Sequence, residues 1–400
     1  MNILLAIPSL AIGGAEVFVV RLANALSQRG HKVFLLRLRS IRPSSSIEER
    51  VFKQVKVVAL KDQLSPLQSV WWKLLYVTTQ WNPGLHRRVI FLRKKVSAKV
   101  LVNFLEKFCL EENIDVINSH LQAADWAVAQ YFLKKPRSQR FVISMHGCYN
   151  QAKYLVGTAG TAQISSTDRV MEAANRIVLL TPKNKRPLQT FVLKSTPVYI
   201  PLGFEKPSAS KSVSLCYSSS FPITFGLVSR AVARKGWEEA ILAAGLLHDE
   251  DIDCRLILVG DGECLPSLIN MYDHLSYIEF VGATARVLDW VQKFDVGLFP
   301  SYIESESYPN TVIEYLACGK PVIGTDIGEV KNMMSDPDGR LAGKLLHYSP
   351  AGTSVEELAN CMRQYAENSD LLAAHGSVAD AAFEKFDMNR CLDAYEAVYR

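Results

Sequence analysis

Two glutamates, Glu306 and Glu314, are separated by seven residues in the polar stretch that follows an apolar run at 296–300. A helical pattern begins within this stretch, near Asn310 or Thr311. Free N–H groups at the start of a helix can bind a phosphate, and a nearby carboxylate can accept hydrogen bonds from sugar or ribose hydroxyls. The stretch therefore indicates a site in which a phosphate and a sugar could bind side by side.

Two cations, Arg230 and Lys235, follow another apolar run at 224–229. Each could neutralise phosphate charge, and the guanidinium of Arg230 could do so through two parallel hydrogen bonds. Taken alone, two cations after a strand are usually solvated. Their place at the end of an expected strand favours the phosphate role.

The N-terminal half offers a glycine pair and two histidines. Gly13 and Gly14 follow the first apolar run and open a helical pattern, where glycine lets the backbone approach an anion closely. A tight turn without a ligand is the alternative for such a pair. His120 and His146 each stand at or just after the end of an expected strand, where a side chain can reach a ligand.

The elements that position these residues form two series of short apolar runs alternating with helical patterns. A Ser-rich, helix-poor segment at 207–220 separates the two series. This alternation of strands and helices predicts an α/β fold of two facing, doubly wound, Rossmann-like lobes. Ligands of such folds bind at the carboxyl ends of the parallel strands. The expected strands are residues 3–7, 31–36, 55–60, 116–117, 141–145, 177–181 and 198–201, then 224–229, 255–260, 277–281, 296–300 and 321–325.

Length and composition agree with two ordinary globular lobes. The 400 residues exceed the roughly 250 to 300 that a single core accommodates. Hydrophobic residues make up 48% and charged residues 21%, which excludes a disordered chain. The eight cysteines lack the spacing of a zinc site, so we expect reduced thiols.

Charge is divided unevenly along the chain. Residues 1–200 carry 29 Lys and Arg against 11 Asp and Glu, or +18, whereas residues 201–400 carry 16 against 29, or −13. Residues 63–105 form a basic, aromatic segment, which has seven Lys and Arg residues, several tryptophans and no acidic residue. An anionic membrane surface would suit such a segment, and a solvated surface helix with its tryptophans packed inward is the equal alternative. No nucleic-acid module accompanies the charge, so we expect no nucleic-acid partner.

The N-terminus and the apolar runs bear on localisation. The first residues lack a basic region and lead into a glycine-rich turn, so they predict a strand rather than a signal peptide. No apolar run approaches the roughly 20 residues of a membrane-spanning helix. We therefore expect a cytoplasmic protein, or one bound peripherally at the inner face of the membrane.

The stretch from Glu306 to Glu314, with the continuation at 317–323, resembles the E-x7-E signature of retaining glycosyltransferases of family 4, group 1, which have the GT-B architecture. Glu304 does not fit this spacing, because Val312 would be its counterpart. The resemblance extends over most of the chain. It implies an acceptor-side domain at 1–205, a donor domain at 206–383 and a C-terminal helix, 384–400, that crosses back to the first domain.

The resemblance also implies a role for each candidate residue. Those near the reaction would be Glu306, which orients the sugar, His146, and the phosphate-binding Arg230 and Lys235. Donor contacts would come from Gly13, Gly14, Ala283, Asn310, Thr311 and Glu314, with Ala283 at the base and Glu314 at the ribose. His120 remains either structural or acceptor-side.

The implied reaction is the transfer of a sugar from a UDP- or GDP-type donor to a saccharide or lipid-linked acceptor, with retention, in polysaccharide or cell-surface glycan synthesis. No cofactor and no metal are expected, because the cations replace magnesium. The Asp-x-Asp match at 251–253 precedes a strand and is interpreted as solvated. Pro309 has no N–H, which leaves the phosphate contacts to Asn310 and Thr311.

Three alternatives stay open at this stage. A nucleotide-sugar epimerase or a sugar phosphorylase would share the architecture and would act on the donor without an acceptor. A catalytically silent sugar-nucleotide-binding protein would keep its role after Glu306→Ala or Arg230→Ala.

Overall fold

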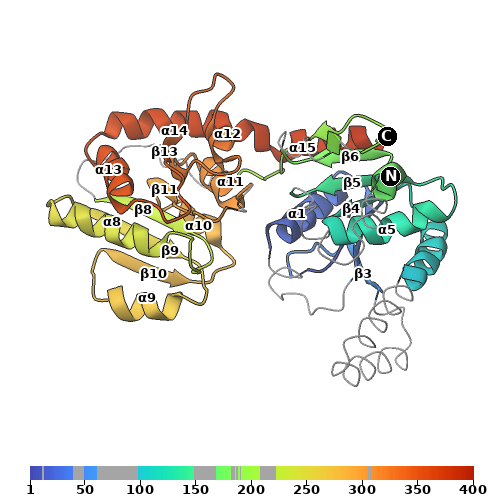
Figure 1. Cartoon of the computed structure of the whole chain (residues 1–400), viewed down its shortest axis with the longest axis horizontal. Coiled ribbons are helices and arrows are strands. Elements are labelled where there is room, and N and C mark those ends of the chain that lie inside the picture. Colours follow the sequence, from blue (N-terminus) through green and yellow to red (C-terminus); the bar gives the residue numbers. More distant parts are fainter. Residues whose placement is uncertain are drawn as a thin grey trace. The chain divides into compact units, whose positions relative to one another are not determined.

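The structure, a computed structural model, describes residues 1–10, 13–38, 49–60, 98–147, 168–181, 185, 188–189, 191–207, 222–304, 306 and 308–400. The chain divides into two compact units, coloured along the sequence in Figure 1. The first unit comprises Met1–Gly203 and Met388–Arg400, and the second comprises Phe204–Asp387. Each unit is built around a parallel sheet and has its own hydrophobic core.

The described residues of the first unit form a seven-stranded sheet in the order β3-β2-β1-β4-β5-β6-β7. All neighbouring strands run parallel. The strands are β1 (Asn2–Ile7), β2 (Lys32–Arg37), β3 (Lys56–Ala59), β4 (Val116–His120), β5 (Arg140–Met145), β6 (Arg176–Leu179) and β7 (Val198–Tyr199). Their near-continuous apolar runs fit a sheet that is covered on both faces.

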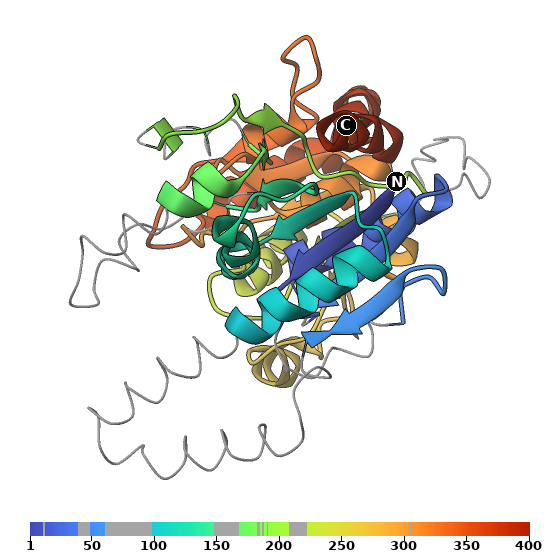
Figure 2. The ribbon, with the colours of Figure 1, turned by 90° about the vertical axis from the view of Figure 1, so that its right-hand side faces the viewer.

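Helices cover both faces of this first sheet. The core beneath α5 (Gln122–Lys134) also includes side chains of the helical residues 98–109 and 170–173. The opposite face carries α1 (Gly14–Gln28) and α15 (Met388–Tyr399), which pack against each other. Figure 2 shows the first sheet with β3 at its edge.

The second unit contains a six-stranded parallel sheet in the order β10-β9-β8-β11-β12-β13. Its strands are β8 (Ile223–Val228), β9 (Cys254–Val259), β10 (Ile278–Gly282), β11 (Val296–Phe299), β12 (Val322–Thr325) and β13 (Gly343–Leu346). The described helices are α8 (Trp237–Asp249), α9 (Leu265–Tyr272), α10 (Val287–Val291), α11 (Asn310–Ala317), α12 (Val330–Met334), α13 (Val355–Ala366) and α14 (Ser369–Phe383), followed by the 3₁₀ turn η3 (Glu384–Phe386). Both sheets thus have the doubly wound order that the sequence predicts.

Two layers of helices enclose the second sheet. Side chains of α8 and α13 share one core with the strands, and these two helices lie side by side in Figure 1. Helices α11, α12 and α14 contact one another in a separate layer. The start of α11 follows β11, so it lies at the carboxyl edge of the sheet.

The chain changes unit at two points that are held together. Phe204 forms a parallel bridge with Asp387, and its N–H donates to the carbonyl of Phe386 over 2.7 Å. The boundaries therefore fall at 203/204 and 387/388, whereas the sequence placed them at 205/206 and 383/384. The 3₁₀ turn and the end of α14 stay with the second unit, and α15 packs in the first.

The strand predictions differ from the structure mainly at their ends. Prolines that follow β7 and β11 lie outside these strands, because proline cannot donate to a ladder. β4 runs to His120, three residues beyond the prediction, which ended at 117. The sequence does not predict β13, a short strand whose first residue is a glycine with positive φ.

The basic segment 63–105 lies largely outside the described residues, and only 98–105 belong to them, as part of a helix. Among the helices that are described, none combines the length and the apolar character needed to cross a membrane.

Candidate functional site

Lys235 and Glu306 meet in an ion pair at the carboxyl edge of the second sheet. The Lys235 side chain is 13% exposed and that of Glu306 is 17% exposed, so solvent screens the pair only partly. The ammonium also lies 5.9 Å from the centroid of the Phe299 ring. The contact joins the residue predicted to bind phosphate to the residue predicted to orient the sugar.

Hydrogen bonds between two loops bring this pair together. The carbonyl of Arg234 accepts from the N–H of Tyr302 at 3.0 Å, and the Arg234 guanidinium donates to the Tyr302 carbonyl at 2.9 Å. Gly236 follows with a φ of 78° and caps α8, a conformation that glycine adopts without strain. The loop after β8 is thus fastened to the loop after β11, with Lys235 and Glu306 on the two sides.

The N-terminus of α11 lies in the same loop region. Pro309 is its N-cap residue and provides no side-chain cap. The hydroxyl of Thr311 donates to the carbonyl of Val228 at 3.2 Å, which turns the side chain toward the end of β8. The backbone N–H groups at Asn310 and Thr311 stand in the first turn, where helix N–H groups have no partner within the helix.

Tyr315, which the sequence analysis did not single out, anchors α11 beneath the site. Its buried hydroxyl accepts from the N–H of Val228 at 2.8 Å and donates to the carbonyl of Leu298 at 3.1 Å. Burial raises the pKa of this phenol above its ordinary value. An aromatic residue four positions after Thr311 looks in sequence like ordinary core, so no pattern revealed this role.

The other predicted residues of the second unit follow neighbouring strands at the same edge. Arg230 follows β8 and is exposed, and its side chain forms no ion pair among the described residues. Ala283 is exposed directly after Gly282, the last residue of β10. Glu314 is half-buried in α11, one turn beyond Asn310. This edge therefore carries two cations, two carboxylates and a helix N-terminus.

Two glycines in the loop after β9, Gly260 and Gly262, have a packing role at this edge. A side chain at Gly260 would collide with the carbonyl of Ser229, and one at Gly262 with the carbonyl of Ala231. The N–H of Ala231 donates to the carbonyl of Asp261 at 3.0 Å. The loops after β8 and β9 therefore pack backbone against backbone. This packing fixes the backbone on both sides of Arg230.

The first unit holds the remaining predicted residues. Gly13 caps α1 with an extended backbone, and the carboxylate of Glu16 folds against it, where a side chain at Gly13 would collide. Burial raises the pKa of Glu16, partly offset by a hydrogen bond from its own N–H. The start of α1, at Gly14, therefore already has a carboxylate beside it.

His146 contacts His120, which the sequence left as structural or acceptor-side. Nδ1 of His120 lies 2.9 Å from Nε2 of His146, and the ring of Phe18 meets both imidazoles edge-on. Burial lowers the pKa of His146 to about 4 and that of His120 well below its ordinary value. Both rings are therefore neutral at pH 7, and one proton lies in the contact between them.

Two family models match the chain on either side of the unit boundary. The model for Glycosyltransferase Family 4 matches residues 12–205, and the model for Glycosyl transferases group 1 matches residues 222–368. Together they span most of the sequence. The chain belongs to glycosyltransferase family 4.

Curated relatives and solved structures agree with this assignment. The chain is 25% identical to an uncharacterized glycosyltransferase of Methanocaldococcus jannaschii over 340 residues. This match covers 81% of this chain and 87% of the relative. It is 29% identical over 101 residues, 25% of this chain and 26% of the relative, to the N,N'-diacetylbacillosaminyl-diphospho-undecaprenol alpha-1,3-N-acetylgalactosaminyltransferase of Campylobacter jejuni. The Anabaena protein Alr3699/HepE, solved in complex with UDP, has a TM-score of 0.69 at 16% identity, over 100% of this chain and 99% of that one. The last likeness shows the GT-B fold.

Metal ligands do not gather among the described residues of this glycosyltransferase: no group of three or more His, Cys, Asp or Glu side chains could hold an ion there. The Asp-x-Asp match, Asp251 to Asp253, lies in the turn between α8 and β9. This turn is at the amino edge of the second sheet, opposite the edge that carries Lys235 and Glu306.

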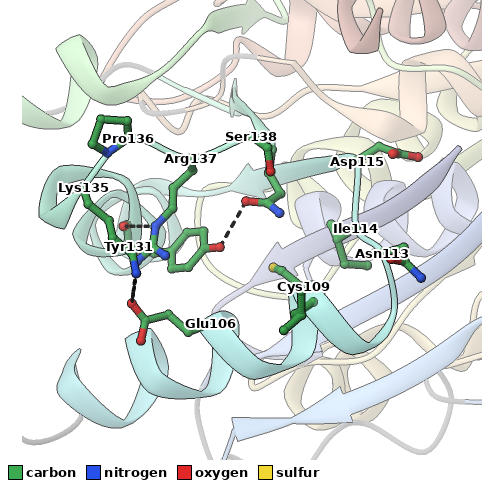
Figure 3. Close-up of a pocket in the computed structure, with 12 residues that line it drawn as sticks. Glu106, Cys109, Asn113, Ile114, Asp115, Tyr131, Lys135, Pro136, Arg137 and Ser138 are labelled. Atoms are coloured by element: carbon green, nitrogen blue, oxygen red, sulfur yellow. Dashed lines mark hydrogen bonds and ion pairs between the residues drawn. The ribbon is translucent and has the colours of Figure 1, made fainter.

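A pocket of about 540 Å³ in the first unit of the glycosyltransferase lies at the amino ends of β4 and β5 (Figure 3). The guanidinium of Arg137 stacks on the Tyr131 ring, 3.9 Å from its centroid, and donates to Glu106 at 2.7 Å. The hydroxyl of Tyr131 donates to Gln139 at 3.1 Å. Burial raises the pKa of the Cys109 thiol in the pocket wall to about 11. These polar groups satisfy one another, at the edge of the sheet away from the predicted ligand sites.

Proposed function

We propose that this glycosyltransferase moves a sugar from a nucleotide-diphosphate sugar, of UDP or GDP type, to a saccharide or lipid-linked acceptor with retention of anomeric configuration. The donor occupies the carboxyl edge of the second sheet, and the first unit holds the acceptor. The observation that carries the proposal is the largely buried Lys235–Glu306 ion pair beside the N-terminus of α11. A phosphate-binding cation and a sugar-binding carboxylate in one contact match a phosphorylated sugar.

The donor diphosphate would be held by Arg230, Lys235 and the N–H groups of Asn310 and Thr311. These groups stabilise the negative charge that develops on the departing phosphate, and such preorganised charge is often the largest contribution to catalysis. Lys235 is already oriented by Glu306, so little reorganisation is needed when the diphosphate arrives. Arg230, which is exposed, contacts the phosphates as well.

The remaining donor contacts follow from position along the strand ends. Glu306 accepts hydrogen bonds from the transferred sugar, and Glu314, one turn further along α11, accepts from the ribose. The backbone at Ala283, after β10, meets the base. Gly13 and Gly14 in the first unit face the phosphates, and neutral His146 hydrogen-bonds a hydroxyl of the reacting sugar.

In the proposed reaction the bond from the anomeric carbon to the phosphate oxygen breaks while the acceptor oxygen bonds to that carbon on the same face. The proton of the acceptor hydroxyl passes to the departing phosphate oxygen. No protein base takes part, because the departing phosphate oxygen accepts the proton. No metal ion takes part, because the protein's cations and helix N–H groups neutralise the diphosphate. The nucleoside diphosphate leaves as the second product of the reaction.

A thermal-shift panel of UDP- and GDP-sugars identifies the donor, and NMR of the product then reads the anomeric configuration. A retained configuration with an added acceptor supports the proposal, and an inverted product contradicts it. Epimer formation without an acceptor would indicate an epimerase, and sugar phosphate formed with added phosphate would indicate a phosphorylase. Donor binding without any turnover would indicate a silent binding protein.

We further propose a membrane-held acceptor in polysaccharide or cell-surface glycan synthesis, at the inner face of the membrane. The basic, aromatic segment 63–105 motivates this, together with the relative from Campylobacter jejuni whose name gives a diphospho-undecaprenol acceptor. Flotation with liposomes that contain anionic lipids tests the association. Absence of binding at low salt would contradict it.

A further inference from the structure

Arg37, the last residue of β2, buries a permanent charge without a full set of partners. The residue is 7% exposed, and its Nε and Nη1 atoms are buried without any hydrogen-bond partner. A guanidinium stays protonated at any physiological pH, so it cannot reduce this cost by losing its proton. Two nitrogens of a buried cation therefore lack acceptors within the protein.

The alternation of side chains along β2 places Arg37 on a defined face of the sheet. Phe34 and Leu36 belong to the core beneath α5, so Arg37 lies on the opposite face, which α1 covers. In the sheet register Arg37 is opposite Ile7, and the N–H of the next residue donates to the Ile7 carbonyl at 3.1 Å. This position is the carboxyl edge of the sheet, where parallel strands present ligand-binding groups.

His120 supplies a second buried nitrogen without a partner on the same face. Ser119 is in register with Ala6, which puts His120 level with Ile7 and Arg37, on the other side of β1. The Nε2 atom of His120 is buried and has no hydrogen-bond partner. Two strand spacings, about 10 Å, separate the two backbones. The same edge and face therefore hold three nitrogens that the protein itself does not satisfy.

Burying a charge without a partner destabilises a fold, and an apolar side chain of similar size would be preferred for stability alone. At the same edge the carboxylate of Glu16 folds against Gly13. Among the residues that the structure describes, no ion pair includes Arg37, whose Nε and Nη1 atoms have no hydrogen-bond partner. The missing acceptors therefore point to an anion that comes from outside the chain.

We propose that Arg37 binds a phosphate or diphosphate group of the acceptor. This inference rests on the proposed function, in which the first unit holds the acceptor. The donor diphosphate is already matched by Arg230, Lys235 and α11 in the second unit, so the cation of the first unit is left for a second anion. The acceptor of this enzyme is then a phosphorylated saccharide or a lipid-diphosphate-linked one.

The test measures binding of inorganic pyrophosphate to the full-length protein by calorimetry, with and without saturating UDP. In the presence of UDP, Arg37→Met should weaken pyrophosphate binding by at least about tenfold, because the lost contact involves a charged group. Arg37→Lys, which keeps the charge with a different geometry, should fall in between. Arg50→Met, at an exposed position of the same unit, is the matched control and should bind like the wild type.

A second readout separates a binding role from a structural one. Without ligand, Arg37→Met should melt at the same temperature as the wild type or higher, since it removes an unsatisfied buried charge. A markedly lower melting temperature, or a variant that does not fold, would show that Arg37 has a structural partner and would overturn the inference. Unchanged pyrophosphate affinity in Arg37→Met overturns it as well.

The UDP arm identifies the source of the anion. If the effect of Arg37→Met disappears once UDP is bound, Arg37 contacts the donor phosphates, and the acceptor assignment is wrong. Failure of UDP and GDP to bind at all would instead contradict the proposed donor site, while the pyrophosphate titration without nucleotide would still report on Arg37. The two proposals can thus fail separately.

Discussion

Lys235 and Glu306 come from loops after different strands, yet they form one ion pair. Glu306 neutralises the amine that the proposed function assigns to phosphate. Binding of the donor adds negative charge beside Lys235 and a hydroxyl beside Glu306. The ammonium of Lys235 and the carboxylate of Glu306 thus lie in a largely buried environment. Their electrostatic interactions with a ligand are stronger there than in water.

Lys235→Met should lower kcat/KM for the donor by roughly 10²- to 10³-fold, the usual cost of removing one group that stabilises the departing charge. Glu306→Gln, which keeps the shape and removes the charge, should lower it as well. Steady-state kinetics with the donor from the thermal-shift panel would measure both. Lys331→Met, an exposed lysine of the same unit, is the control, and equal losses there would contradict a specific role for Lys235.

His146 makes stability depend on pH. Its pKa in the folded protein is about 4, below the ordinary 6.5, because burial disfavours the charged ring. As pH falls from 6.5 to 4, the unfolded chain takes up a proton that the folded protein does not. The free energy of unfolding therefore decreases with falling pH in this window, by up to roughly 3 kcal/mol for this residue.

Denaturant unfolding at a series of pH values would measure this dependence. His146→Gln should have a smaller decrease between pH 6.5 and 4 than the wild type. Some dependence should remain, because the pKa of His120 is lowered by the same cause. His274→Gln, at an exposed position, is the matched control. An unchanged slope in His146→Gln would contradict the desolvation of this ring.

At the scale of elements, the buried phenol of Tyr315 joins α11 to two strands of the second sheet. The hydroxyl of Tyr315 bonds both the N–H of Val228 in β8 and the carbonyl of Leu298 in β11. Space for the ring comes from Gly297 in β11, where a side chain would collide with it. The contacts of Tyr315 with β8 and β11 thus help to fix the position of α11, and with it the helix N-terminus at Asn310.

Tyr315→Phe should lower the free energy of unfolding by about 1–3 kcal/mol, because the variant leaves a buried N–H and a buried carbonyl without their partner. Chemical denaturation would measure the loss. Tyr348→Phe is the control, since the Tyr348 hydroxyl makes no hydrogen bond to a described residue. A Tyr315→Phe variant as stable as the control would mean that the two backbone groups find other partners.

For the molecule as a whole, α15 joins the end of the chain to the first unit. The hydroxyl of Tyr399 donates to Asn118 at 2.8 Å, and that of Tyr395 lies 3.2 Å from the Ser144 hydroxyl. Both tyrosines are buried, and Arg29 pairs with Asp393 at the surface. The buried side chains of α15 complete the face of the first sheet that also carries His120.

Deletion of residues 388–400 should therefore destabilise the first unit and leave the second intact. Each buried apolar side chain of α15 contributes roughly 1.5–3 kcal/mol, and several are lost together. Hydrogen exchange should show lost protection in β4 and β5 and retained protection in β8 and β9. Equal loss in both units would contradict two independent cores. Tyr399→Phe is the milder companion variant, with a smaller loss confined to the same strands.

The order of elements and the positions of the proposed donor-binding residues at strand ends could be predicted from sequence. Apolar runs, helical periods and turn residues are local signals, so they located strands and placed Arg230 directly after one strand and Glu306 in the loop after another. Ends were less accurate, and β13 was missed, because a four-residue strand that begins with glycine has almost no local signal.

Sequence alone thus determined that this protein has two parallel-sheet lobes and an E-x7-E loop at a strand end. The tertiary structure alone decided that Lys235 pairs with Glu306, that His120 contacts His146, and that Arg37 is buried with unsatisfied nitrogens. Each of these contacts depends on the register of neighbouring strands and on how their loops are fastened. Such interactions join residues far apart in the chain, and no local period or propensity encodes them.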